Sequence, residues 1–267
     1  MHEIVPARDR DGFLVLAGMT EQSWVDLSDP LRLEFEYVQR IAEVLEATVL
    51  GRPEAERIRV VHIGGGGLTL PRYVAARRPH SAQIVLEPDA DLVENVRVRL
   101  PLPPGSGVKI RLADGLTGVA AMPEAYADAV ILDAFAVAQV PGELVTSDFF
   151  ADVARILRPG GVFLANVTDR SPNAWNRRVL AGICERWRDV AVSAEVPVWK
   201  GRRFGNFVVA ASSVPLPVSV LERDVTRAAY PHRLVWGPTL ARWVGDADPF
   251  TPADAQPSPP PGHAWFG

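Results

Sequence analysis

The stretch Ile58-Arg-Val-Val-His-Ile-Gly-Gly-Gly-Gly-Leu-Thr-Leu70 decides the fold of this chain. Val60, Val61 and Ile63 form the short apolar run of a buried parallel strand, four glycines follow it, and a helical pattern begins near Leu68. A strand, a glycine turn and a helix bring backbone N–H groups close to a bound nucleotide, because glycine has no Cβ to obstruct the approach. The stretch therefore predicts a nucleoside site, with a purely structural glycine turn as the alternative.

A carboxylate follows at the spacing that a ribose site requires. The next predicted strand ends in Glu87, about twenty residues beyond the glycines, where a carboxylate meets ribose hydroxyls. The motif Gly64-x-Gly66-x-x-Thr69 lacks the third glycine of a dinucleotide fingerprint, so it is weak support for NAD.

The composition is that of an ordinary globular protein. Of 267 residues, 48% are hydrophobic and 22% charged, which is enough for one large core, or for one core and a small N-terminal lobe. The net charge of −4 argues against binding to nucleic acid, and neither a membrane span nor a signal peptide is recognised, so we expect a cytoplasmic protein. The single cysteine, Cys184, excludes an internal disulfide and is expected in the core; no residue cluster has metal-ligand spacing.

Strands and helices alternate after residue 58, which predicts a doubly wound α/β sheet of parallel strands. The strands are expected at residues 58–63, 83–87, 108–112, 129–133 and 162–166. Residues 190–199 and 204–212 then read as an antiparallel hairpin. A Rossmann-like sheet that ends in such a hairpin is the plan of the class I methyltransferase fold and not of a nicotinamide dehydrogenase.

The flanking segments suggest three parts. Residues 1–50 are expected to form a small β-hairpin lobe and a linking helix that starts at Asp29-Pro30. Residues 51–245 form the nucleoside-binding domain, with a further helix at 220–230. Residues 246–267 are a proline-rich tail that either drapes over the core or is disordered.

Over roughly residues 13–212 the chain resembles the spermidine synthase-like family of polyamine synthases. The resemblance rests on Gly64-Gly-Gly, Glu87, Asp114-Gly115, Asp133 and the segment Pro-Gly-Glu-Leu-Val-Thr-Ser-Asp-Phe-Phe at 141–150. It implies that Gly64, Gly65, Gly66 and Glu87 hold a nucleoside and that Asp114, followed by Gly115, hydrogen-bonds adenine. It also implies that Asp133 is the catalytic residue facing an attacking amine and that Gln22 reaches the aminopropyl donor.

The resemblance also sets the expected ligands. S-adenosylmethionine or its decarboxylated form is the expected cofactor, without a metal, and a small-molecule amine is the expected partner. A homodimer is left open.

The acceptor half of the site departs from the family pattern. Gly67 stands where polyamine synthases carry an aspartate, and the run after Asp133 is Ala134-Phe-Ala-Val-Ala in place of small hydroxyl residues and a second aspartate. By the resemblance, the missing carboxylates are those that would hold the cationic ends of a diamine and of the donor. A buried ammonium group without a partner costs several kcal/mol, so we expect putrescine to be a poor acceptor unless other acids replace these two.

Further polar residues are candidates for contact with the acceptor. They are Tyr73, Glu143, Asn166 and Asp169, with turn capping as the alternative for the last two. His62 is expected to be a hydrogen-bonded core residue.

Three functions remain open from the sequence. The first is aminopropyl transfer from decarboxylated S-adenosylmethionine to an amine other than simple putrescine. The second is methyl transfer from S-adenosylmethionine, and the third is nucleoside binding without catalysis. We favour an enzyme because Glu87, Asp114 and Asp133 are all present.

Overall fold

The computed structural model describes residues 2–8, 11–18, 20–227 and 231–261. Within these residues the strands form a three-stranded sheet of order β1-β2-β3 and an eight-stranded sheet of order β11-β9-β10-β8-β7-β4-β5-β6. The strands are β1 (His2–Pro6), β2 (Phe13–Ala17), β3 (Thr20–Val25), β4 (Arg59–Ile63), β5 (Ala82–Leu86), β6 (Val108–Arg111), β7 (Ala127–Leu132), β8 (Leu157–Asp169), β9 (Asp189–Glu195), β10 (Gly205–Ser212) and β11 (His232–Trp236). The helices are α1 (Glu36–Ala47), α2 (Thr69–Arg77), α3 (Ala90–Arg99), α4 (Gly115–Ala120), η1 (Gly142–Val145), α5 (Ser147–Ile156), α6 (Ala174–Arg186), α7 (Val196–Trp199), α8 (Val218–Arg227) and α9 (Gly237–Val244).

The large sheet has the predicted doubly wound plan. Strands β6, β5, β4, β7 and β8 are parallel, and β4 pairs with both β5 and β7, so the strand order reverses at β4. Strand β10 pairs antiparallel with β8 and with β9, which is the predicted terminal hairpin. The short helix α7 lies at the tip of this hairpin. Because parallel strands end at the same edge, their carboxyl ends form one continuous rim, the usual position of a ligand site.

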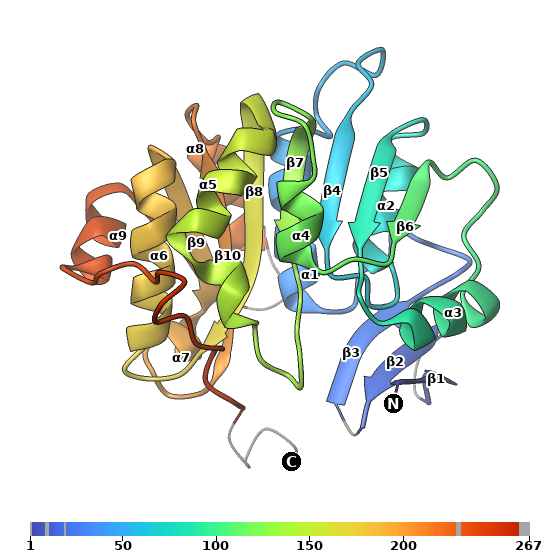
Figure 1. Ribbon diagram of the computed structural model, residues 1–267, viewed down its shortest axis with the longest axis horizontal. Helices are drawn as coiled ribbons and strands as arrows, with labels where there is room; N and C mark the ends of the chain where they lie inside the picture. Colours follow the sequence, from blue (N-terminus) through green and yellow to red (C-terminus); the bar gives the residue numbers. More distant parts are fainter. Residues whose placement is uncertain (1, 9–10, 19, 228–230, 262–267) are drawn as a thin grey trace.

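Helices cover both faces of the sheet (Figure 1). One core cluster joins α4, α5, α6 and α9 to the sheet, and a second joins α1, α2 and α8 to its other face. A third cluster packs the N-terminal sheet against α3 and β5. Strand β7 is buried along its whole length, as expected for a central parallel strand.

Near the N-terminus, two predictions need correction. The predicted hairpin is present as β2 and β3, but β1 adds an unpredicted third strand. The first helix begins at Glu36 and not at Asp29-Pro30. The Asp29 carboxylate instead accepts a hydrogen bond from the Leu31 backbone N–H at 3.1 Å, and its carbonyl accepts one from Arg32, so this segment forms a turn.

The C-terminal part also differs from expectation. The predicted helix at 220–230 is α8, whose predicted last three residues lie outside the described residues. Strand β11 and helix α9 were not predicted. Cys184 is exposed and not in the core, because α6 buries Leu180 and Ile183 and turns the next residue outward. Residues 246–261 of the proline-rich tail drape over the core, which is one of the two alternatives expected for the tail. Residues 262–267 lie outside the described residues.

The N-terminal sheet packs directly onto the glycine turn. A Cβ at Gly67 would lie 2.8 Å from Cγ2 of Val25 and 3.2 Å from Cγ2 of Val15. The Gly67 N–H donates to the Ser23 hydroxyl at 3.0 Å, and the Thr69 hydroxyl donates to the Trp24 carbonyl at 2.9 Å. The aspartate of the polyamine synthases therefore has no room at position 67 in this chain.

We expect Gly67→Ala to lower the free energy of unfolding by about 1–3 kcal/mol, because the added methyl group overpacks a filled contact. Gly65→Ala is the matched control: its Cβ would lie 3.3 Å from the Glu87 side chain, a longer distance than at position 67, so its loss should be under about 1 kcal/mol. Urea denaturation of both variants measures the difference. Equal stabilities would contradict the packing of β2 and β3 on the turn.

Candidate functional site

The predicted site residues from four strand ends meet at the carboxyl rim of the sheet. Gly64 follows β4, Glu87 follows β5, Asp114 follows β6 and Asp133 follows β7. Asn166 lies in the last part of β8, the next strand along. The parallel arrangement therefore brings together side chains that are far apart in the sequence.

The glycine turn contacts both neighbouring strands. Gly64 has φ +97°, and a Cβ there would lie 2.2 Å from the carbonyl oxygen of Asp133. The Gly65 N–H donates to Oε2 of Glu87 at 2.8 Å, and the Asp89 N–H donates to Oε1 of the same carboxylate at 3.0 Å. The turn thus holds the Glu87 carboxylate at the rim, and each carboxylate oxygen has lone pairs left for a ligand hydroxyl.

Asp133 has two hydrogen-bond partners from different elements. Its Oδ1 accepts from the Asn166 side-chain amide at 2.9 Å, and the Tyr37 hydroxyl of α1 donates to the same carboxyl group. The residue stays partly accessible at the rim, yet protein surrounds its carboxyl group, and this burial raises its pKa to about 6. The bonds from Asn166 and Tyr37 lower the pKa and so limit the rise. Burial, followed by the charge of Asp133, raises the pKa of Tyr37 well above its usual value, so Tyr37 stays a donor.

Asn166 has an unused acceptor beside this carboxylate. The residue is 1% exposed, and its Oδ1 is a buried atom without a hydrogen-bond partner. An unpaired buried carbonyl oxygen is costly, and a ligand N–H would satisfy it. The structure therefore leaves one buried acceptor unsatisfied next to the Asp133 carboxylate.

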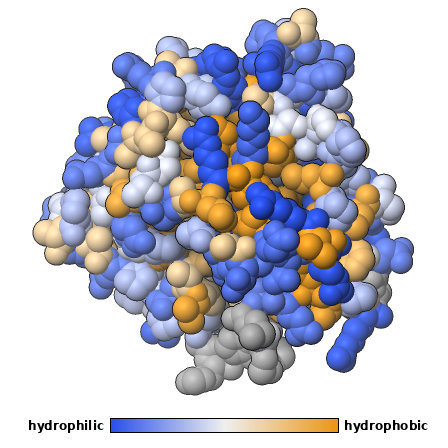
Figure 2. Space-filling model, turned by 45° about the vertical axis from the view of Figure 1, so that its right-hand side comes forward, coloured by the Kyte–Doolittle hydropathy of each residue, from blue (hydrophilic) through white to orange (hydrophobic). Residues whose placement is uncertain are grey.

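Asp114 is an exposed helix cap. Its carboxylate accepts from the Thr117 N–H at 2.8 Å and from the Thr117 hydroxyl at 2.7 Å, and these bonds lower its pKa. Gly115 begins α4, and a Cβ there would lie 2.4 Å from Cγ2 of Ile63. Leu112 and Leu116 lie exposed on either side of Asp114. Figure 2 shows hydrophobic side chains gathered in the middle of the face on which β5 and β6 come forward.

Gln22 lies at a bulge in the N-terminal sheet. The register changes from Val15 opposite Ser23 to Leu16 opposite Glu21, so Gln22 is the unpaired residue of β3. A bulge of this kind re-aims a side chain. The neighbouring Ser23 contacts the glycine turn through Gly67, a role that the sequence analysis did not assign.

Three other candidates do not contact Asp133. The Tyr73 hydroxyl donates to Glu46 of α1 at 2.8 Å, within the core between α1 and α2. Glu143 is exposed on η1. Asp169 is buried, and its two oxygens accept from the backbone N–H groups of Arg170 and Asn176 at 2.7 and 2.8 Å. These bonds correspond to turn capping, the alternative to a contact with the acceptor.

His62 is a core residue, as predicted. It is buried, and its Nε2 lies 2.9 Å from Oε1 of Gln83. Burial lowers the pKa of His62 to about 4, which keeps the ring neutral.

Sequence reasoning missed Tyr37. It lies in α1, near the expected core positions Phe35 and Val38, and nothing in the local pattern separates its hydroxyl from the apolar stripe. Its contact with Asp133 depends on how α1 packs against the sheet, which a single sequence does not show.

The described part of the chain contains neither a metal-binding group nor a membrane-spanning helix. No group of three or more His, Cys, Asp or Glu residues there could hold a metal ion. None of the helices described is both long and apolar enough to cross a bilayer.

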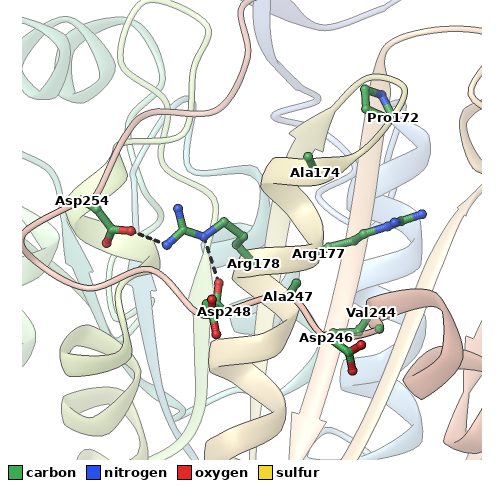
Figure 3. A pocket seen from close by; sticks show the side chains of 10 residues that line it. Pro172, Ala174, Arg177, Arg178, Val244, Asp246, Ala247, Asp248 and Asp254 are labelled. Atoms are coloured by element: carbon green, nitrogen blue, oxygen red, sulfur yellow. Dashed lines mark hydrogen bonds and ion pairs between the residues drawn. The ribbon is translucent and has the colours of Figure 1, made fainter.

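A cavity of about 700 Å³ lies away from the rim residues, between α6, α9 and the C-terminal segment (Figure 3). Arg178 lines it, and its Nε and Nη2 donate to the carbonyl groups of Asp248 and Pro249 at 2.9 and 3.0 Å, while Nη2 also pairs with Asp254. None of the predicted site residues lines this cavity, so we assign the candidate site to the rim.

Comparison with known proteins supplies relatives for the chain. No family model matches the sequence. It is 29% identical over 154 residues to a polyamine aminopropyltransferase of Chromobacterium violaceum, covering 57% of this chain and 56% of the relative. It is 26% identical over 142 residues to a polyamine aminopropyltransferase of Vibrio vulnificus, covering 52% and 46%. The chain therefore spans about half the length of the curated relatives it matches.

A solved structure matches over nearly the whole chain. The crystal structure of a probable spermidine synthase from Corynebacterium glutamicum is 31% identical, covers 94% of this chain and 92% of its own, and has a TM-score of 0.87. The spermidine synthase of Thermotoga maritima, 17% identical with a TM-score of 0.59, covers 91% and 80% and shares the fold.

We expect the Asp133 carboxyl group to titrate near pH 6, and the substitution Asn166→Leu to raise this pKa by about one to two units, because it removes a hydrogen bond to the ionised form. Carboxyl-carbon NMR across a pH series measures both values, with Asp133→Asn to identify the resonance. Asp114 is the internal control, because its titration should not move. An unchanged Asp133 pKa in Asn166→Leu would contradict the contact.

Proposed function

Because the chain belongs to the spermidine synthase family, a family of transferases, we propose that it transfers an aminopropyl group from decarboxylated S-adenosylmethionine to an amine. The observation that carries this proposal is the Asp133 carboxylate, held by Tyr37 and Asn166 at the rim beside the glycine turn. The location in the cytoplasm and the homodimer remain predictions.

The donor nucleoside is proposed to lie across the ends of β4, β5 and β6. The Glu87 carboxylate would accept from the ribose hydroxyls, since its position is fixed by the Gly65 and Asp89 N–H groups. Gly64 and Gly66, both at positive φ, let the turn lie close to its neighbours, because a Cβ there would lie 2.2 Å from the Asp133 carbonyl oxygen and 2.4 Å from the Ser23 hydroxyl. Asp114 would accept from the adenine amino group, with Leu112 and Leu116 as apolar surface for the ring. Gln22 is proposed to reach the aminopropyl end.

The proposed reaction is a displacement at the carbon beside the sulfonium group. The amine nitrogen forms the new C–N bond, the C–S bond breaks, and the amine proton passes to Asp133. An alkylamine with a pKa of about 10.4 is mostly protonated at pH 7, so freeing its lone pair costs roughly 4–5 kcal/mol. A carboxylate in contact takes this proton during attack, and alignment of the two substrates contributes much of the remaining rate.

The acceptor is proposed to carry less charge than a diamine. Position 67 has no room for a carboxylate, and the loop after Asp133 offers Ala134, Phe135 and Ala136. The free Oδ1 of Asn166 would accept one N–H of the reacting nitrogen. These features fit a small amine whose second end is neutral or apolar.

The proposal is tested by binding and turnover together. Calorimetry with decarboxylated S-adenosylmethionine, S-adenosylmethionine, methylthioadenosine and NAD should give tightest binding for the decarboxylated donor. Asp133→Asn should bind this donor with little change, while turnover with an accepted amine falls about 10²–10⁴-fold, since the proton acceptor is gone. Preference for intact S-adenosylmethionine with methyl transfer would establish the methyltransferase alternative, and tight binding of NAD alone would contradict both.

We expect putrescine to be a poor acceptor. Two charge-assisted hydrogen bonds are missing, each worth about 1.5–3 kcal/mol, so the productive complex should weaken a hundredfold or more. Mass spectrometry with the decarboxylated donor and a panel of monoamines, diamines and amino alcohols measures the ranking. Turnover of putrescine on the order of 1–10 s⁻¹ would show that other acids hold its second ammonium group, and the proposal for a less charged acceptor would then be wrong.

A further inference from the structure

We propose that Ser258 is a positioning residue, through which the C-terminal segment 246–261 clamps the loop that follows Asp133 and so fixes the acceptor side of the site. We call this segment the strap and residues 134–140 the acceptor loop. The inference rests on the proposed function for its catalytic consequence, but the clamp itself is a structural statement with its own measurement.

The strap is anchored to the core before it reaches the site. Phe250 is fully buried, and its carbonyl accepts from the Ser147 N–H at 2.8 Å. The Arg178 guanidinium lies 4.0 Å from the centre of the Phe250 ring. It also pairs with Asp254, as Figure 3 shows. Further along, the Gln256 carbonyl accepts from the Trp175 indole N–H at 2.9 Å. These contacts fix the path of the strap toward the rim.

Ser258 then joins the acceptor loop to strand β8. Its N–H donates to the Val140 carbonyl at 3.0 Å, its hydroxyl accepts from the Val140 N–H at 2.9 Å, and its carbonyl accepts from the Gln139 side-chain amide. Its hydroxyl also lies 3.2 Å from the Thr168 hydroxyl of β8. Thr168 lies two residues beyond Asn166, on the same face of the strand. One fully buried side chain therefore ties the acceptor loop, which follows Asp133, to the strand that carries Asn166.

The acceptor loop needs such a restraint because its turn is strained. Ala136 and Gln139 exchange two backbone hydrogen bonds of 2.8 and 3.0 Å, and the residues between them, Val137 and Ala138, have φ values of 49° and 62°. Two positive φ values are typical of a type I′ turn, which favours Asn-Gly, and a β-branched residue there is an outlier. Residues in this conformation cost about 1–3 kcal/mol each and persist when their surroundings fix them.

Burial of the turn does not provide the restraint. Val137 at its tip is 92% exposed, so packing does not hold the turn in place. The contacts of Ser258 lie instead at the base of the turn, on Gln139 and Val140. The strap therefore stabilises the strained conformation, and with it the positions of Ala134 and Phe135 beside Asp133.

The test is Ser258→Ala, which removes the hydroxyl contacts to Val140 and Thr168. Hydrogen exchange of the amides of residues 136–140 should become about tenfold faster, the factor that one lost hydrogen bond is worth. The KM for the acceptor should rise by a similar factor while the affinity for the donor stays unchanged. Thr239→Ala is the control, because that exposed hydroxyl lies outside the strap and accepts from Arg242 within α9 at 3.2 Å; both quantities should stay at wild-type values.

A second change separates positioning from general loss of stability. Replacing Val137 and Ala138 by Asn and Gly relieves the strain, so in the Ser258→Ala background it should restore slow exchange in the loop and the acceptor KM. If Ser258→Ala does not fold, Gln139→Ala carries the same test, since it removes the side-chain donor to the Ser258 carbonyl. Unchanged loop exchange, an equal loss of protection throughout the chain, or no rescue by Asn-Gly would overturn the clamp. Faster loop exchange in a protein that transfers no aminopropyl group would overturn the proposed function alone.

Discussion

The close approach of the glycine turn to strand β7 is the constraint on which the site depends. A Cβ at Gly64 would lie 2.2 Å from the Asp133 carbonyl oxygen. The ends of β4 and β7 can therefore lie this close together only because position 64 has no side chain. The same turn donates to Glu87 on one side and to Ser23 on another. A single short segment thus sets the relative positions of β5, β7 and the N-terminal sheet, because strand β4 lies where the strand order reverses.

The part of the structure that follows from local pattern was predictable. Apolar runs, glycine turns and strand-end carboxylates identified the parallel strands, the terminal hairpin and the residues Gly64, Glu87 and Asp133 at one rim, because each signal lies within a few residues. Strand β11 and helix α9 were not predicted. They come directly after residues 220–230, which the sequence pattern assigned to a single helix. The start of α1 was misplaced, because the sequence Asp29-Pro30 is compatible with a turn as well as with the first residues of a helix.

The surroundings of Asp133 were not predictable in the same way. Tyr37 and Asn166 reach it from a helix almost a hundred residues earlier and from the neighbouring strand, and only the packed structure brings them together. Their effect on the carboxyl group is nevertheless chemically specific. Burial raises its pKa to about 6, which makes it a stronger base than an exposed aspartate. In the proposed reaction, a higher pKa would leave less of the group as carboxylate, and a lower one would make it a weaker acceptor for the amine proton.

The two halves of the proposed site therefore depend on different parts of the chain. The donor half is proposed to use residues that follow β4, β5 and β6 for the nucleoside, with Gln22 of the N-terminal sheet at the aminopropyl end. The acceptor half is bounded by segments from the two ends of the chain: Val15 and Val25 fill the space beside Gly67, and Ser258 fixes the base of the acceptor loop. A carboxylate at position 67 would have to displace the N-terminal sheet, and a different acceptor loop would have to break its bonds to the strap. In the proposed site, acceptor choice is therefore coupled to the packing of both terminal segments, and the glycine turn is coupled to the N-terminal one.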